Sequence, residues 1–353
     1  MWFIPGPVEL SNNARIAAAK TIVGHRSNGF REIFADCKSN LKKIYRTDQN
    51  VFILTSSGTG AIECGLLNIV DRKDKVLAID NGDFGKRAGE QAKLYSDNVE
   101  VMQYPYGTGA RVEEVKAKID DFKPDVVAIV HNDTSTALEN PVRAICSYAY
   151  ESGAMTFVDS VSGLGGTEMS FDAWKIDVCA SAAQKCIGGP AGTAFIAAST
   201  RALEKAKKIP KKSIYFSFEK FAKSADKNET PNTPTISGFY SLQVALGEVI
   251  AEGLDARIAR HGAESAFVQK SLQDIGFELF TEEGYRSKTV TAFKCDRAED
   301  LRKILTGDFG FTIAGGQADL KGKIARISNM ANITHADLGA LMEAIAAAKR
   351  KLG

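Results

Sequence analysis

Short apolar runs alternate with amphipathic stretches between about residue 50 and residue 200. Several of these runs are apolar throughout, which is typical of strands that helices cover on both faces of a sheet. Helical patterns such as AIECGLLNIV and PVRAICSYAYESG lie between them. This alternation predicts an α/β fold with a mostly parallel, doubly wound sheet of seven strands. The predicted strands are 51–56, 75–80, 99–104, 125–131, 154–160, 177–183 and 192–198.

The pattern changes after residue 210. Residues 211–235 are rich in Lys, Ser and Asn, contain two prolines and are predicted to be a loop or linker. One long helical pattern follows, over roughly 237–275, and the remaining chain mixes strand patterns (TVTAFKC, KIARISN) with helical ones. We therefore expect an N-terminal segment (1–15) that packs with a small domain, a large domain (16–240), and a linking helix with a smaller C-terminal α+β domain (241–353).

The composition excludes several classes of protein. The 45 basic and 43 acidic residues give a net charge of +2 and form no basic stripe, so no nucleic-acid partner is expected. The six cysteines contain no Cys-x-x-Cys pair and the four histidines are dispersed, so neither a disulfide framework nor a metal site is predicted. No apolar run approaches the roughly 20 residues of a membrane span, and the N-terminus lacks a signal-peptide pattern. A cytoplasmic protein without membrane contact is expected.

Three polar motifs follow predicted strands, at the edge where open parallel sheets bind their ligands. The run Ser57-Gly58-Thr59 suits a phosphate at a helix N-terminus, and it suits an ordinary helix cap equally well. The run lacks both the Walker ending and the dinucleotide fingerprint. Asp159 ends another strand. Lys185 ends a third and precedes a glycine-rich loop, where burial lowers a lysine pKa and makes the amine a nucleophile for Schiff-base chemistry.

The region around Lys185 resembles the lysine-site signature of class V aminotransferases, which use pyridoxal 5′-phosphate (PLP) and have the fold type I architecture. The resemblance extends over nearly the whole chain. Within the family, the chain resembles the alanine/serine–glyoxylate or pyruvate aminotransferases and, in part, the phosphoserine aminotransferases. The segments that carry it are Pro5-Gly6-Pro7, GHRSNGF (24–30), SSGTGAIE (56–63), NGDFGKR (81–87), HNDTSTALENP (131–141), VDSVSGLGG (158–166), NTPTISGFY (232–240) and ARISN (325–329).

The resemblance implies roles for individual residues. Lys185 would bind PLP as a Schiff base and move the substrate proton, while Asp159 would pair with the pyridine nitrogen. Arg326 would bind the substrate α-carboxylate. The other implied cofactor ligands are Ser57, Gly58, Thr59 and Gln184 at the phosphate, Phe84 and Val161 on the two ring faces, Ser135 near the ring hydroxyl, and Asn232 with Thr233 at the phosphate of the neighbouring subunit. A homodimer with its active sites at the subunit interface is therefore implied.

Transamination is favoured over the other reactions of this fold. A desulfurase would carry a stacking histidine in place of Phe84 and a mobile cysteine in the C-terminal domain, where Cys295 lies in a predicted strand instead. A non-catalytic binding module would be expected to lack Lys185 or Asp159. The expected reaction transfers the amino group of alanine or serine to glyoxylate or pyruvate. The alternative donor is phosphoserine or another acidic amino acid, with His25-Arg26 as a second anion clamp rather than an interface or helix-start pair.

Overall fold

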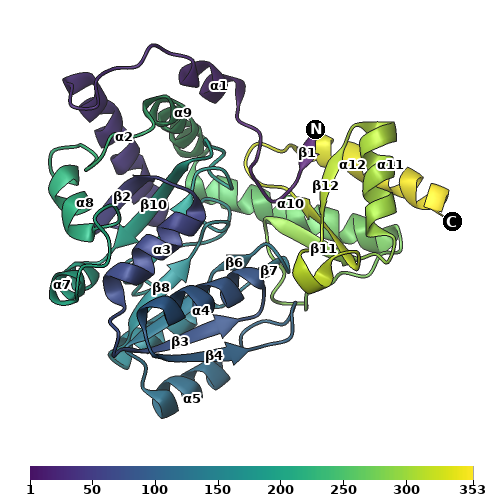
Figure 1. Ribbon diagram of the computed structural model, residues 1–353. Helices are drawn as coiled ribbons and strands as arrows, with labels where there is room; N and C mark the ends of the chain where they lie inside the picture. The colour runs from purple at the N-terminus through teal and green to yellow at the C-terminus, as the bar shows by residue number, and fades with distance from the viewer. Residues whose placement is uncertain (353) are drawn as a thin grey trace.

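A computed structural model describes residues 1–352 of the chain. Figure 1 shows a larger lobe built from the first two thirds of the sequence and a smaller lobe that holds both termini. The helices of the large lobe are α1 (Asn12–Ala18), α2 (Asn28–Tyr45), α3 (Gly58–Ile69), α4 (Asp83–Tyr95), α5 (Val112–Phe122), α6 (Val142–Glu151), α7 (Thr200–Lys208), α8 (Phe218–Ala225) and α9 (Ile236–Glu252). The others are α10 (Leu254–Asp274), α11 (Ala298–Phe309), η1 (Ala318–Leu320) and α12 (His335–Leu352).

The large lobe is built on a seven-stranded sheet within the described residues, in the order β2-β10-β9-β8-β5-β3-β4. Its strands are β2 (Asn50–Thr55), β3 (Lys75–Asp80), β4 (Asn98–Gln103), β5 (Val126–Val130), β8 (Met155–Asp159), β9 (Val178–Ala182) and β10 (Thr193–Ala198). All pairs are parallel except those of β10, which is antiparallel to both neighbours. The predicted mostly parallel α/β sheet is confirmed, and each predicted strand coincides with an observed one.

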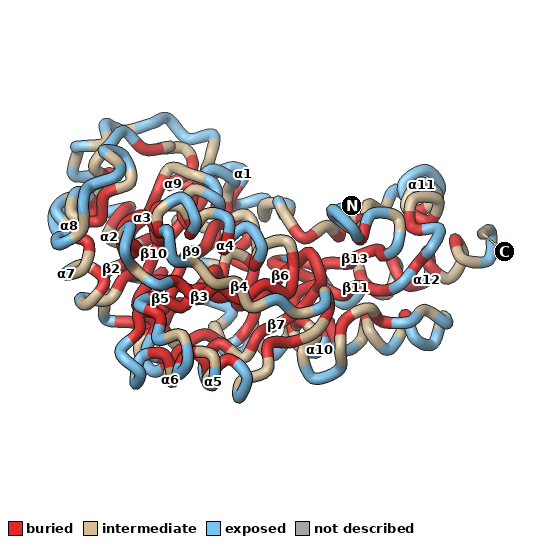
Figure 2. The backbone as a smooth tube through the Cα atoms, turned by 60° about the horizontal axis from the view of Figure 1, so that its bottom comes forward, coloured by how far each residue is buried: buried red, intermediate tan, exposed pale blue. Residues whose placement is uncertain are grey.

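Helices cover both faces of this sheet. Figure 2 shows α3 and α4 on one side of the strands and α5 and α6 on the other, with buried residues concentrated between them. All five residues of β5, β8 and β9 are buried, as are all six of β10. This two-sided burial explains why these strands are apolar runs without alternation.

The small lobe contains a second sheet, in the order β1-β12-β13-β11. These strands are β1 (Trp2–Phe3), β11 (Val290–Lys294), β12 (Thr312–Gly315) and β13 (Ile324–Ser328), and a further hairpin of β6 (Asn132–Asp133) and β7 (Leu138–Glu139) follows β5. Strand β1 brings the N-terminus to the edge of this sheet, where it pairs in parallel with β12. Phe3 joins the buried cluster formed by β11, β13 and helices α10 to α12. The domain limits at 15/16 and 240/241 stay predictions.

Two local predictions are wrong. The segment 211–235 is not only a loop, because it contains helix α8, whose Phe218 and Phe221 are buried against β2. The long helical pattern of 237–275 is two helices, because Gly253 between α9 and α10 has φ +84° and ends the first helix. Among the helices of residues 1–352, none is long and apolar enough to cross a membrane.

Candidate active site

The residues singled out in the sequence meet at one edge of the large sheet. Strands β2, β9, β8, β5 and β3 run in the same direction, so their carboxyl ends lie side by side. Asp159 is the last residue of β8, and Lys185 follows β9 by three positions. Ser57 and Phe84 follow β2 and β3, each at the start of a helix. The topology therefore places these residues at one edge of the sheet.

Lys185 is mostly buried, and its amine donates a hydrogen bond to the backbone carbonyl of Pro5. Burial lowers the pKa of the Lys185 amine to about 8; the charge of Arg326 acts in the same direction, and Asp159 and Asp133 oppose it. At neutral pH roughly a tenth of such a lysine is the free amine, against less than a thousandth for an ordinary lysine. Lys185 therefore has the availability that a nucleophile and proton carrier need.

Asp159 is only 3% exposed, and its carboxylate accepts a hydrogen bond from the Val161 N–H at 2.9 Å. Burial raises the pKa of Asp159 to about 7; the Val161 N–H and the Lys185 charge oppose this, while the Asp133 carboxylate adds to it. A buried carboxylate of this kind is stabilised by a cationic partner. The protonated ring nitrogen of a pyridine is such a partner.

The Ser57-Gly58-Thr59 run begins helix α3, with the Ser57 hydroxyl as its N-cap, accepting from the Gly60 N–H. Gly58 packs directly against Val161, because a Cβ placed on it would lie 2.9 Å from Val161 Cγ2. Ser57 and Thr59 are exposed, so their polar groups and the helix N-terminus are available to an anion. The side-chain oxygen of Gln184 is buried and lacks a hydrogen-bond partner among residues 1–352. A phosphate would need the side-chain NH2 of Gln184 instead, because an amide oxygen only accepts hydrogen bonds.

Phe84 and Ser135 are held together by Asp133, a residue that the sequence analysis did not single out. The fully buried Asp133 carboxylate accepts from the backbone N–H groups of Phe84 at 3.1 Å and Gly85 at 3.3 Å, and from the Ser135 hydroxyl at 2.5 Å. The same Ser135 oxygen accepts from the Asp83 N–H at 2.9 Å. Asp133 therefore caps α4 and fixes Phe84 beside Ser135. Its only sequence signal is an acidic residue in the polar run after β5.

Arg326 lies on β13, only 4% exposed, and points from the small lobe towards the large one. It donates to the carbonyl oxygens of Gly315 at 2.9 Å and Thr134 at 2.6 Å, and to the Gln317 side chain at 3.4 Å. No ion pair joins it to a carboxylate within the described residues. Burial lowers the pKa of Arg326 to about 10, although Asp133 and Asp83 oppose the shift. The guanidinium is suited to a carboxylate that comes from outside the chain.

The other implied residues form a separate group at the segment 229–233. Arg26 donates to Glu229 at 3.0 Å and to the Thr230 carbonyl at 2.7 Å. Its hydrogen bonds all go to residues 229–231, and none within residues 1–352 reaches Lys185, Asp159 or Arg326. Asn232 and Thr233 are exposed and line a shallow depression with Thr55. Within one subunit, charge interactions link Lys185 with Asp159 and Arg326, whereas no hydrogen bond within residues 1–352 links Arg26 to them.

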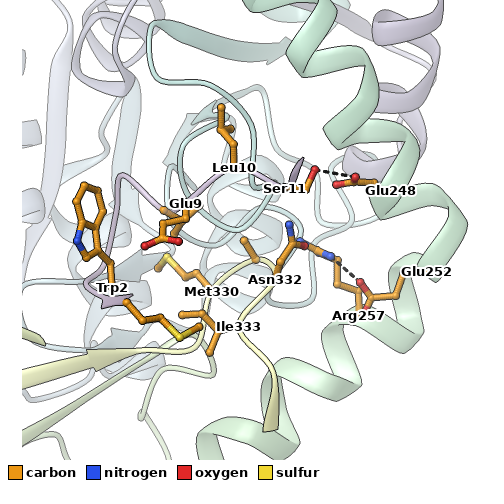
Figure 3. Close-up of a pocket in the computed structure, with 13 residues that line it drawn as sticks. Trp2, Glu9, Leu10, Ser11, Glu248, Glu252, Arg257, Met330, Asn332 and Ile333 are labelled. Atoms are coloured by element: carbon orange, nitrogen blue, oxygen red, sulfur yellow. Dashed lines mark hydrogen bonds and ion pairs between the residues drawn. The ribbon is translucent and has the colours of Figure 1, made fainter. Parts of the chain in front are cut away.

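Two further features of the described residues bear on the site. A cavity of about 400 Å³ lies between the N-terminal segment and helices α9 and α10, and neither Lys185 nor Asp159 nor Arg326 lines it (Figure 3). Within residues 1–352, no group of three or more His, Cys, Asp or Glu side chains is placed to hold a metal ion, and all six cysteines are free and buried.

This fold and this lysine–aspartate–arginine arrangement define a fold type I transferase. The chain belongs to the class V aminotransferases: residues 12–341 match the family Aminotransferase class-V. It is therefore a transaminase. An uncharacterized aminotransferase of Methanocaldococcus jannaschii is 35% identical over 363 aligned positions, which cover 100% of this chain and 93% of that protein. A protein of Synechococcus sp. named soluble hydrogenase, small subunit, is 33% identical, with 100% of this chain and 94% of that protein covered.

Solved structures agree with this assignment. The alanine–glyoxylate aminotransferase of Nostoc sp. superimposes with a TM-score of 0.95 at 27% identity, covering 99% of this chain and 95% of that one. Further relatives are named as glyoxylate aminotransferases of aspartate, serine and alanine. A phosphoserine aminotransferase of Cytophaga hutchinsonii has a TM-score of 0.90 at 25% identity. Both branches of the predicted resemblance are therefore represented among the similar proteins.

Proposed function

We propose that this transaminase uses PLP and transfers the amino group of a small L-amino acid, alanine or serine, to glyoxylate or pyruvate. The observation that carries the proposal is the buried pair of Lys185, with a pKa of about 8, and Asp159, with a pKa of about 7, below a buried arginine that has no carboxylate partner in residues 1–352. The residues fit PLP, because an anion site, a ring wall and a carboxylate for the ring nitrogen surround the lysine.

The bound cofactor supplies an electron sink for the substrate carbanion. Asp159 would hold the ring nitrogen protonated, because its buried negative charge would stabilise that proton. The helix α3 N-terminus with Ser57, Thr59 and Gln184 would hold the phosphate, and Val161 and Phe84 would contact the ring. Lys185 removes the proton from the substrate Cα and returns it as general base and acid. Arg326 fixes the substrate carboxylate, which sets the Cα proton towards the lysine.

The choice of a small neutral donor is supported by the charges of the site. Arg326 is a buried arginine of the site that lacks a carboxylate partner in the described chain, and one α-carboxylate satisfies it. Relatives with names of alanine–, serine– and aspartate–glyoxylate aminotransferases support a glyoxylate acceptor. A second candidate donor, phosphoserine or another acidic amino acid, is favoured by the phosphoserine aminotransferase among similar folds and by the His25-Arg26 pair.

We further propose a cytoplasmic homodimer in which Asn232 and Thr233 complete the phosphate site of the partner subunit. Both side chains are exposed, and neither has a hydrogen bond from its side chain within residues 1–352. Arg26 and Arg31 hold Glu229 at 3.0 and 2.7 Å, which keeps the segment in a defined position at the surface. A fixed, exposed polar segment is suited to an interface between subunits.

The test of this function is spectroscopic. The purified protein should acquire the visible absorption of lysine-bound PLP, and Lys185→Ala should lose it, whereas Lys208→Ala on the exposed end of α7 should not. Single-turnover reactions with alanine, serine, aspartate, glutamate and phosphoserine should then consume this band fastest with alanine or serine. A wild-type protein that binds no PLP at saturation refutes the function. If phosphoserine alone consumes the band, the donor is an acidic amino acid and not alanine or serine.

A further inference from the structure

The first eleven residues are tied to three separate parts of the molecule. Strand β1 pairs with β12 in the small sheet. The Val8 N–H then donates to the Gln184 carbonyl at 3.0 Å, directly beside the lysine. The Ser11 hydroxyl donates to Glu248 of α9 at 2.8 Å, and Figure 3 shows Ser11 turned towards this carboxylate. The N-terminal segment therefore crosses from the small lobe to the large one over the Lys185 loop.

Lys185 meets this segment between its anchors. Its Nζ donates to the carbonyl oxygen of Pro5. Gly6 lies against the lysine alkyl chain, because a Cβ on Gly6 would be 2.6 Å from Lys185 Cδ and 3.0 Å from its Cε. Gly6 also has φ +93°, a conformation that disfavours every residue with a side chain. Space and backbone conformation independently require glycine at this position.

We propose that Pro5 and Gly6 form a positioning element for the catalytic lysine. The Pro5 carbonyl binds the Lys185 amine whenever that amine is not bonded to a ligand, and Gly6 closes over the side chain and keeps water from it. The proposal rests on the proposed function, since it concerns the lysine of that same site. It adds to that site a stretch of backbone from the opposite end of the chain.

The chemistry explains why such an element is useful. A lysine that both accepts and returns a proton must remain near its reaction position in both protonation states. A carbonyl oxygen accepts a hydrogen bond from the ammonium and from the neutral amine alike. A backbone cover without a side chain also excludes water, and this exclusion sustains the burial that lowers the Lys185 pKa to about 8.

The anchors connect this element with the substrate. Strand β12 pairs with β1 on one side and with β13, which carries Arg326, on the other. The covering segment and the carboxylate-binding guanidinium therefore belong to one small sheet.

The first test replaces Gly6 by alanine and measures how fast the full-length protein, freed of cofactor, captures added PLP between about pH 6 and pH 10. Wild-type capture should rise with a midpoint near the lysine pKa of about 8. Gly6→Ala displaces the segment and lets water reach the amine, so the midpoint should rise by about one unit and capture at neutral pH should slow about tenfold. Gly153→Ala is the matched control, because Gly153 has φ +89° with no atom within 4 Å of its would-be Cβ. An unchanged midpoint in Gly6→Ala overturns the proposal.

The second test needs neither PLP nor a stable Gly6 variant. Lys185→Met keeps the alkyl chain and removes the donor, so the backbone amides of Ile4, Gly6 and Val8 should exchange their hydrogens several-fold faster than in the wild type. The amides of α6, which lies away from the segment, should be unaffected. Equal exchange in residues 4–8 overturns the proposal. A wild type that captures no PLP refutes the proposed function, and this exchange measurement then decides the positioning role by itself.

Discussion

Arg326 and Arg26 are both implied to bind anions, and the structure gives them opposite surroundings. Arg326 is 4% exposed and bonds two backbone carbonyls and an amide oxygen. Arg26 has a side chain that is 44% exposed and forms an ion pair with Glu229, which Arg31 shares. A buried guanidinium that bonds neutral oxygens retains most of its attraction for a carboxylate, whereas a paired and exposed one has lost most of it. The comparison favours Arg326 for our proposed substrate recognition and Arg26 for placement of the segment.

The same contrast separates the two groups of site residues. The group at the strand ends has shifted pKa values, because burial acts on Lys185, Asp159 and Arg326 together. In the group at 229–233, Asn232 and Thr233 are exposed, whereas Glu229 is partly buried and Thr230 is buried. Perturbed ionisable groups gather where chemistry takes place. The first group is therefore the one we propose for the reaction, and the second is the one we propose for the subunit interface.

The largest expected effect concerns Asp159 in the cofactor-free protein. Its folded pKa of about 7 exceeds the ordinary 3.8, so the folded state keeps a proton that the unfolded state loses between about pH 4 and pH 7. Relative to Asp159→Asn, wild-type stability should therefore fall as pH rises through this window. Asp159→Asn does not titrate, so its free energy of unfolding should gain on the wild type by up to about 4 kcal/mol. Urea unfolding at both ends of the window measures this.

The control for this measurement is the exposed Asp120→Asn, which should follow the wild type at every pH. A wild type and an Asp159→Asn variant with parallel pH profiles would mean that Asp159 is not buried as a carboxyl of raised pKa. Asp159 would then no longer belong with Lys185 and Arg326 among the buried residues of shifted pKa. PLP should reverse the trend, because the protonated ring nitrogen stabilises the Asp159 charge.

The second effect tests Arg326 directly. Arg326→Gln keeps a hydrogen-bond donor and removes the charge, so kcat/KM for alanine should fall by roughly 100-fold, which corresponds to about 3 kcal/mol. PLP binding should be retained. Arg297→Gln changes a small-lobe arginine with a 57% exposed side chain and should leave kcat/KM unchanged. If Arg326→Gln keeps wild-type kinetics, another group binds the carboxylate and the comparison of the two arginines fails.

Much of the fold could be predicted from sequence, because the strands of the large sheet are buried on both faces and therefore read as apolar runs. Strands β1 and β12 have two and four residues, too few for a periodic signal. The break at Gly253 could not be read either, since the apolar spacing continues across it and only the positive φ ends the helix. Helix α8 escaped notice because lysines and serines dominate the surrounding segment.

The site was predictable where it follows strands and not where it depends on distant contacts. Lys185 and Asp159 occupy strand ends, which parallel sheets bring together without further information. Asp133 was missed because a polar run after a strand is equally typical of a turn. The Glu229 partner of Arg26 lies 203 positions away in sequence, so its pairing could not be inferred. The contact of Pro5 with Lys185 spans 180 positions and was hidden for the same reason.

A smaller effect is expected at Thr233. If its hydroxyl reaches the phosphate of the partner subunit, Thr233→Ala should release PLP about tenfold faster, the usual cost of one hydrogen bond to a charged group. Thr306→Ala, whose exposed hydroxyl bonds the Phe311 carbonyl, serves as the control. Mixed dimers that combine one Lys185→Ala subunit with one Thr233→Ala subunit show whether Thr233 acts across the interface. Action across the interface leaves one intact site in each mixed dimer, whereas action within a subunit leaves none.

The smallest effect is expected at Arg26. It tests whether this arginine, unlike Arg326, is dispensable for the turnover of alanine. Arg26→Ala removes one of two arginines on Glu229, and Arg31 still holds that carboxylate through two hydrogen bonds of 3.0 and 2.7 Å. Turnover of alanine should therefore stay within about threefold of the wild type, since exposed ion pairs contribute little. Arg31→Ala is the matched control. A loss of tenfold or more with phosphoserine, and none with alanine, would show that Arg26 binds an acidic side chain across the dimer interface. Arg26 would then share substrate recognition with Arg326, and the acidic-donor alternative would replace the neutral one.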